Sequence, residues 1–192
     1  MEKPVFILAS ASPRRLSLLA SIGIAPDRVV APDIDETPRP HEVPRALAQR
    51  LALEKLRVVA AAEPQAFVLA ADTVVGCGRR ILPKAESAAQ VRECLALLSG
   101  RRHHVYTGLA LQTPSGKIIQ RLCDSTVIFQ RLDAAMIEAY VAQGEGIGKA
   151  GGYAVQGRAA GFTRFISGSH SNIVGLSLFD VAQMLRQGGY PL

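Results

Sequence analysis

The sequence predicts an α/β fold built on a mixed, twisted sheet. Short apolar runs typical of buried strands alternate irregularly with segments of helical periodicity. Two strand-like runs also flank Pro114-Ser115-Gly116, a turn sequence typical of a β-hairpin, whose strands are antiparallel. At about 100–200 residues per domain, the chain length predicts a single domain spanning 1–192.

The N-terminal part predicts a strand followed by a helix. The apolar run from Val5 to Ala9 is typical of a buried strand. Ser12 suits the N-cap of the next helix and Pro13 its first turn, because the missing N–H of proline would be unpaired there. We expect this helix to end near Gly23. Its expected apolar face comprises Leu16, Leu19 and Ala20.

The next part predicts a second strand, a long helix and a central strand. The strand is expected over Val29–Asp35 and the helix over Arg45–Ala62. The expected apolar stripe of the helix comprises Leu47, Leu51 and Val58. The run from Phe67 to Ala71 predicts a central strand that delivers Asp72 and Thr73 at its C-terminal end, where open α/β sheets bind ligands.

The remaining elements follow from turn residues and from two expected helix N-caps, Ser87 and Asp133. In chain order they are a turn at 76–78, a helix over 87–98, strands over 105–112 and 117–130, a helix over 133–141, a glycine-rich stretch over 144–161 and a helix over 176–185.

Composition predicts a soluble globular chain that attracts anions. The net charge is 22 − 16 = +6, and 48% of residues are hydrophobic. Aromatic residues make up only 5% and tryptophan is absent, which argues against a surface that stacks bases, so no stable nucleic-acid partner is expected. No apolar run reaches the roughly 20 residues that span a bilayer, so no membrane partner is expected.

The cysteines favour a reducing compartment. Cys77, Cys94 and Cys123 are an odd number without a Cys-x-x-Cys pair, which suggests neither a disulfide framework nor a zinc site. The N-terminal apolar run is too short for a signal peptide. We therefore expect a cytoplasmic protein.

A candidate phosphate site lies where the first strand meets the first helix. A helix N-terminus offers unpaired N–H donors and a positive dipole end. Ser10, Ser12, Arg14 and Arg15 add hydroxyl and guanidinium donors. An ordinary capped helix with two solvated arginines is the alternative interpretation.

Acidic residues form a second candidate group. Asp33, Asp35 and Glu36 precede a proline-rich segment, and Asp72 follows an apolar strand. Carboxylates are ligands for Mg²⁺ and can deprotonate a water molecule. Asp33 and Asp35 also fit a plain turn, whereas a carboxylate at the end of a buried strand needs a partner or a function.

Lysines and one glutamine complete the candidates. Lys55, Lys84 and Lys149 are weak signals singly, because most lysines are merely solvated. Gln156 either reads a base edge with its amide or is an ordinary surface residue.

Several common sites are absent from the sequence. Gly146–Gly151 matches GxGxxG but follows a helix rather than a strand, so it predicts a loop and not a dinucleotide site. His103 and His104 lack partners at metal-ligand spacing. Neither a P-loop nor a GxSxG nucleophile elbow occurs.

These motifs occur in an order that closely resembles the Maf family of nucleoside triphosphate pyrophosphatases, over about 5–185. The matching blocks are Ser10-x-Ser12-x-Arg14-Arg15, Asp35-Glu36-Thr37, Glu54-Lys55, Ala71-Asp72-Thr73-Val74-Val75, Val105-Tyr106-Thr107-Gly108, Lys149-Ala150-Gly151, Tyr153-x-x-Gln156-Gly157, Gly168-Ser169 and Asn172 to Leu176.

The resemblance implies a two-lobed fold, similar to the inosine triphosphate pyrophosphatases, with a central cleft. It implies hydrolysis between the α and β phosphates with a divalent cation, Mg²⁺ or Mn²⁺. Asp72 matches the catalytic proton acceptor, and Glu36 the second acidic position beside the metal. The residues that match phosphate-facing positions are Ser10, Arg14, Arg15, Lys55 and Lys84.

The resemblance also implies a substrate. Arg14, Thr73 and Gln156 match the branch that acts on dTTP and UTP at the positions tied to base choice. The alternatives are a 7-methyl-GTP pyrophosphatase and a non-catalytic nucleotide-binding regulator. A monomer and a homodimer are both compatible with the sequence.

Overall fold

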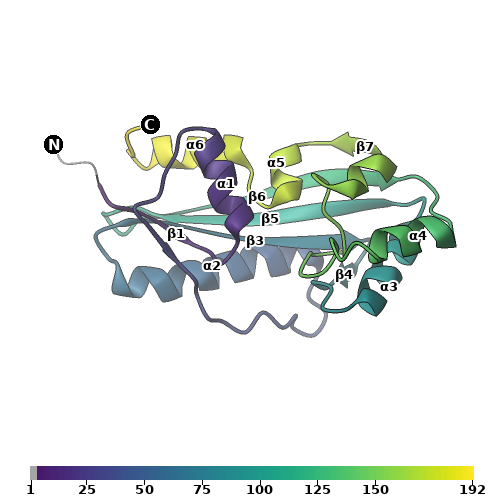
Figure 1. The fold of residues 1–192 in the computed structure, drawn as a ribbon. Helices are drawn as coiled ribbons and strands as arrows, with labels where there is room; N and C mark the ends of the chain where they lie inside the picture. The colour runs from purple at the N-terminus through teal and green to yellow at the C-terminus, as the bar shows by residue number, and fades with distance from the viewer. Residues whose placement is uncertain (1–3) are drawn as a thin grey trace.

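A seven-stranded mixed sheet forms the centre of the structure, a computed structural model that describes residues 4–192 (Figure 1). The elements in chain order are β1 (Phe6–Ala9), α1 (Pro13–Ser21), β2 (Arg28–Val30), α2 (Pro44–Ala62), β3 (Phe67–Cys77), β4 (Arg80–Leu82), α3 (Ala88–Leu98), β5 (Arg102–Gln112), β6 (Ile118–Phe129), α4 (Ala134–Val141), the 3₁₀ turn η1 (Arg158–Phe162), β7 (Thr163–Ser167), α5 (His170–Val174) and α6 (Leu178–Gln187).

The strand order confirms the predicted mixed sheet. The strands run β2-β1-β3-β5-β6-β7, and β4 pairs with β3. β1 is parallel to β2 and β3, whereas the other neighbours are antiparallel. The predicted hairpin joins β5 to β6, with Gln112 opposite Ile118.

Helices cover both faces of the sheet at the end that holds β1 (Figure 1). α2 lies on one face and α1 and α6 lie on the other. Phe6 and Leu8 of β1 pack in the cluster with α6, and Ile7 and Ala9 pack against α2. All four are fully buried, which is why this strand is apolar throughout rather than alternating. Each large side chain contributes roughly 1.5–3 kcal/mol by its burial.

A glycine lets α2 approach the sheet closely. A Cβ atom on Gly108 of β5 would lie 2.1 Å from the carbonyl oxygen of Ala48, so only glycine fits beneath the helix. Gly108 is also the β5 residue opposite Asp72. The close packing of α2 therefore occurs beside the candidate acidic residue.

The other end of the molecule has its own apolar core, packed between the long strands and α3 and α4. Four aromatic side chains form its centre with edge-to-face ring contacts: Phe129, Tyr140, Tyr153 and Phe162. Ser87 and Asp133 cap α3 and α4 as predicted, since their side chains accept the N–H groups of Gln90 and Met136.

The structure corrects the extent of two strands. β2 ends at Val30 rather than Asp35, because its partner β1 ends at Ala9, opposite Val30, and Pro32 lacks an N–H donor. β3 continues past Asp72 to Cys77, since β5 and β4 pair with this part of the strand. Asp72 therefore lies within a strand and not at its end.

Other predictions differ in detail. The turn after β3 is narrower than 76–78, because Gly76 and Cys77 pair with β4. Leu16 and Val58, placed on apolar helix faces, are 40% and 49% exposed. The last helix begins at Leu178, with Ser177 as its N-cap. β4, β7 and α5 were not predicted.

None of the helices in residues 4–192 is both long enough and apolar enough to cross a membrane.

Candidate active site

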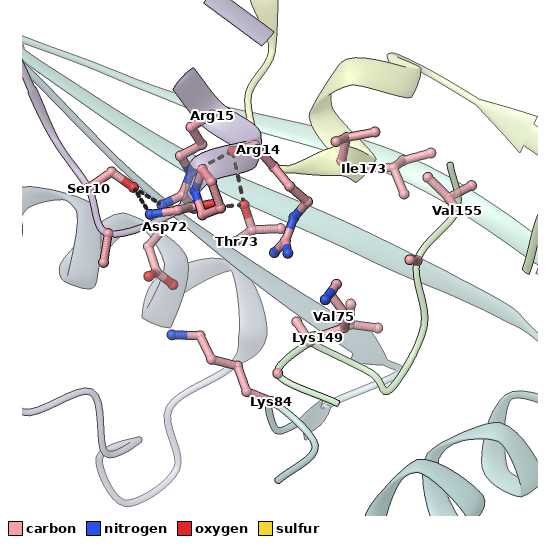
Figure 2. A pocket seen from close by; sticks show the side chains of 18 of the residues that line it. Ser10, Arg14, Arg15, Asp72, Thr73, Val75, Lys84, Lys149, Val155 and Ile173 are labelled. Atoms are coloured by element: carbon pink, nitrogen blue, oxygen red, sulfur yellow. Dashed lines mark hydrogen bonds between the residues drawn. The ribbon is translucent and has the colours of Figure 1, made fainter. Parts of the chain in front are cut away.

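One cavity of about 310 Å³ brings together most of the residues that the sequence analysis named as site candidates (Figure 2). Ten of them are Ser10, Ser12, Arg14, Arg15, Glu36, Lys55, Asp72, Thr73, Lys84 and Gln156, and the candidate Lys149 also lines the cavity. The candidates Asp33 and Asp35 do not line it. The lining candidates come from the connection between β1 and α1, the start of α1, the connection before α2, α2, β3 and two loops. The fold thus brings together residues up to 146 positions apart in the sequence.

The cavity lies at an open edge of β3. On this edge β1 pairs with β3 only as far as Ala70, and β4 pairs only from Val75 onward. Residues 71–74 therefore have no strand neighbour on that side within the described residues 4–192. Because the edge is open, Asp72, which faces α2, and Thr73, which faces α1, both reach the cavity.

The N-terminus of α1 forms one wall. Ser10 follows β1, and Ser12 is the N-cap of a nine-residue helix but makes no side-chain cap bond. The hydroxyl oxygen of Ser10 accepts the backbone N–H of Ser12 at 3.2 Å and a guanidinium N–H of Arg15 at 3.0 Å. The unpaired N–H groups and positive dipole end of α1 suit an anion in the cavity.

Arg15 is buried and makes three hydrogen bonds within the protein. Its Nε donates to the carbonyl oxygen of Gly175 at 2.8 Å, and its terminal nitrogens donate to Ser10 and, at 3.2 Å, to Thr73. Burial lowers its pKa, opposed by the attraction of Asp72. Arg15 thus joins the start of α1 to β3 and to the end of α5.

A chain of alternating charges forms the opposite wall. The Nζ of Lys55 lies 2.5 Å from Oδ1 of Asp72 and 2.6 Å from Oε1 of Glu36. Lys84 pairs with the other carboxylate oxygen of Glu36. Burial alone would raise the pKa of Glu36, but its hydrogen bonds with Lys55 and Lys84 outweigh that effect and hold the pKa below its ordinary value. Both carboxylates therefore have a cation beside them.

The donor set of the cavity is compatible with a divalent cation. Mg²⁺ commonly takes one or two protein carboxylates and completes its shell with substrate phosphates and water. Glu36 and Asp72 supply two carboxylates that share Lys55. No cluster of three or more histidine, cysteine, aspartate or glutamate side chains suited to a metal occurs among residues 4–192, so substrate oxygens would have to supply further ligands.

Two further cations reach the cavity without an ion pair to an acidic side chain in the described part of the chain. Arg14, in the first turn of α1, and Lys149, in the glycine-rich loop, both line it. Burial lowers the pKa of both groups, and the charge of Arg14 lowers that of Lys149 further. Figure 2 shows Arg14 and Lys84 reaching toward the same space from different sides.

The far end of the cavity is apolar, with Gln156 at its rim. Val75, Tyr153, Val155 and Ile173 line this end, and Gln156 is exposed there. The sequence analysis did not assign these four apolar residues to the site. Val75, Tyr153 and Ile173 lie within the motifs that carry the family resemblance, and Val75 also lies two residues after Thr73 and so on the same side of the strand.

Comparison with known proteins finds one matching family model and several similar sequences. A family model described as Maf-like protein matches residues 5–188. A relative from Novosphingobium aromaticivorans named dTTP/UTP pyrophosphatase is 54% identical, covering 98% of this chain and 94% of its own. Relatives with the same name from Caulobacter vibrioides and Gluconobacter oxydans are each 57% identical, covering 97% and 96% of this chain and 97% and 87% of their own.

A solved structure, the Ham1 protein of Staphylococcus aureus, is similar at a TM-score of 0.47 and 17% identity over 65% of this chain and 71% of that chain. The family model spans nearly the whole sequence, and each relative cited is more than half identical across almost its full length. On the match to the family model and to these sequence relatives, the chain belongs to the Maf-like protein family.

Proposed function

We propose that this protein is a nucleoside triphosphate pyrophosphatase that hydrolyses dTTP and UTP to the monophosphate and pyrophosphate. The observation that carries the proposal is the pairing of Asp72 and Glu36 with lysines across the cavity from a helix N-terminus. The relatives named dTTP/UTP pyrophosphatase support the substrate.

In this proposal the triphosphate lies between α1 and the two lysines. The N–H groups at the start of α1, the hydroxyl of Ser12 and the guanidinium of Arg14 bind phosphate oxygens. Lys84 and Arg14 neutralise the negative charge that grows on the leaving pyrophosphate, a contribution that dominates phosphoryl transfer. Arg15 acts indirectly, by holding Ser10 and Thr73 in place.

Asp72 takes the proton of the attacking water. Its carboxylate is 4% exposed, and it faces the cavity from the open edge of β3. Lys55 holds it in position, because the ammonium donates a hydrogen bond to Oδ1. A divalent cation held by Glu36 and Asp72, Mg²⁺ or Mn²⁺, would lower the pKa of a bound water and offset charge on the phosphates.

The apolar end of the cavity receives the base. Val75, Val155 and Ile173 offer contact to the faces of the ring. The amide of Gln156 both donates and accepts, as the edge of a thymine or uracil requires. Arg14 and Thr73, which also line the cavity, complete the set proposed for base choice.

The deciding experiment measures pyrophosphate release from dTTP, UTP, CTP, GTP, ATP and 7-methyl-GTP with Mg²⁺ or Mn²⁺, and with EDTA as the control. We expect release from dTTP and UTP that EDTA abolishes. Preference for 7-methyl-GTP would overturn the assigned substrate but keep the chemistry. A folded sample that binds nucleotide and releases nothing would indicate a regulator instead.

A further inference from the structure

The backbone on either side of Gln156 donates hydrogen bonds to two side chains outside the cavity, Tyr140 and Glu145, which together form the relay. Ala154, two residues before Gln156, donates its backbone N–H to the hydroxyl of Tyr140 at 3.0 Å. Arg158, two residues after it, donates its backbone N–H to the carboxylate of Glu145 at 2.9 Å. Burial and the nearby Glu145 carboxylate both raise the pKa of the Tyr140 hydroxyl. The contacts of Tyr140 and Glu145 thus bracket Gln156 on both sides.

The surroundings of the relay leave it little freedom. Tyr140 is 3% exposed and its ring packs edge-on against Phe162, so its hydroxyl has a fixed position. A Cβ atom on Gly157 would lie 2.0 Å from a carboxylate oxygen of Glu145, so glycine is needed for the carboxylate to reach the backbone there. The hydrogen bond between Glu145 and the backbone of Arg158 therefore depends on glycine at position 157.

Neither relay residue lies in the cavity, whereas the residue between their contacts does. Gln156 lines the cavity, but Tyr140 and Glu145 do not. Tyr140 is in α4, and Glu145 lies in the loop that follows it. A change in either would alter the base end of the site only through the backbone of residues 154–158.

We propose that Tyr140 and Glu145 are positioning residues for base selection, which hold the 154–158 backbone so that Gln156 presents its amide to the pyrimidine. This inference rests on the proposed function. A backbone N–H that loses its acceptor takes another conformation or binds water, and either change releases the segment. The triphosphate end, formed by α1 and the lysines, does not depend on the relay.

The test compares Tyr140→Phe and Glu145→Ala with wild type. We expect the ratio of kcat/KM for dTTP to that for GTP to fall roughly fivefold in each, the effect of one lost hydrogen bond. The fall should come from a higher KM for dTTP, while kcat/KM for GTP changes little. Glu145→Gln retains a carbonyl oxygen and should restore most of the ratio.

A matched control lies on the same helix. Glu138 of α4 is exposed and pairs with Arg92, away from the relay. Glu138→Ala removes a carboxylate from the helix that also holds Tyr140, and it should leave the dTTP-to-GTP ratio of kcat/KM unchanged. The double variant Tyr140→Phe/Glu145→Ala should lose less than the product of the single effects, because both act on one relay.

Two readouts do not need turnover. Amide hydrogen exchange of residues 154–158 should accelerate in Tyr140→Phe and Glu145→Ala but not in Glu138→Ala. Calorimetric affinities for dTTP and GTP in EDTA should show the same loss of discrimination. If wild type binds dTTP preferentially but hydrolyses no nucleotide, the proposed function fails while the relay is still tested by these measurements.

Three results would overturn the inference. The first is unchanged exchange in both relay variants. The second is faster exchange with an unaltered preference between dTTP and GTP. The third is an equal loss for both nucleotides, which would indicate general damage to the site rather than misplacement of Gln156.

Discussion

Lys55 and Asp72, which are 17 residues apart on a helix and a strand, form a buried ion pair with Nζ 2.5 Å from Oδ1. Their side chains are 8% and 4% exposed. An ion pair removed from water contributes little net stability. Loss of one partner is nevertheless destabilising, because it leaves the other charge buried and unpaired. The pair therefore makes the position of the proposed catalytic carboxylate and the packing of α2 on the sheet dependent on each other.

Lys55→Met should lower the free energy of unfolding by about 3–5 kcal/mol at neutral pH, because it leaves the carboxylate of Asp72 buried without its cation. Urea denaturation measures the change. Lys117→Met, at an exposed position in the hairpin, is the control and should change stability little. Equal stability of Lys55→Met and wild type would show that water reaches Asp72 freely.

Asp72→Asn should retain the fold and lower kcat by about a hundredfold to ten-thousandfold, the usual contribution of a general base. The amide keeps the shape of the side chain but cannot accept the proton of water. Pyrophosphate release gives the rate, and a melting curve establishes that the variant is folded. Asp124→Asn, at an exposed carboxylate that pairs with His104, is the control. Substantial turnover by Asp72→Asn would remove Asp72 from the proposed role.

Gln156→Glu should weaken the preference for dTTP and UTP by roughly tenfold, because a carboxylate accepts but does not donate hydrogen bonds. The measurement is kcat/KM across the nucleotide panel. Gln130→Glu changes an exposed glutamine outside the cavity and should leave the profile unaltered. An unchanged profile for Gln156→Glu would contradict base reading by this residue.

Arg15→Lys should cost about 2–3 kcal/mol of stability, since a single ammonium cannot replace the three hydrogen bonds to Gly175, Ser10 and Thr73. Chemical denaturation gives the value. Arg57→Lys, exposed on α2, provides the comparison. If Arg15→Lys is as stable as wild type but has lost activity, Arg15 contacts the substrate directly and does not serve mainly to hold the site together.

The stability of the protein should depend on His103 in mildly acidic solution. Burial lowers the pKa of His103 to about 4, beside Tyr153 and Phe129. Below its unfolded pKa of 6.5, the unfolded chain binds a proton that the folded protein does not. The contribution of neutral His103 is therefore complete above pH 6.5 and is lost as pH falls to about 4, a change of roughly 3 kcal/mol.

Urea denaturation at a series of pH values tests this dependence. As pH falls from 6.5 toward 4, the unfolding free energy of wild type should decrease relative to that of His103→Gln. His104→Gln, at a partly exposed position, is the matched control. Parallel pH profiles for wild type and His103→Gln would contradict the low pKa of His103.

Local signals in the sequence were sufficient for most elements. The Ser12-Pro13 start of α1, the Ser87 and Asp133 caps, and the β5–β6 hairpin all occur as predicted. These features depend on neighbouring residues, which is why pattern alone reveals them. A cytoplasmic location, the absence of a stable nucleic-acid partner and the roles of single site residues stay predictions.

Features that depend on distant partners were harder to predict. The length of β2 depends on where β1 ends, and the length of β3 depends on β4 and β5. Likewise, nothing local distinguishes Arg15 from Arg14, yet one is buried among three partners and the other faces the cavity.

The sequence by itself determined the mixed α/β class, the apolar strands and the set of polar residues that belong together, because periodicity, capping and motif order are written in the chain. The tertiary structure alone decided that β3 has an open edge at residues 71–74, that Lys55 pairs with Asp72, and that Tyr140 and Glu145 accept hydrogen bonds from the backbone on either side of Gln156. Each of these depends on which segments become neighbours when the chain packs, and no local pattern of residues contains that information.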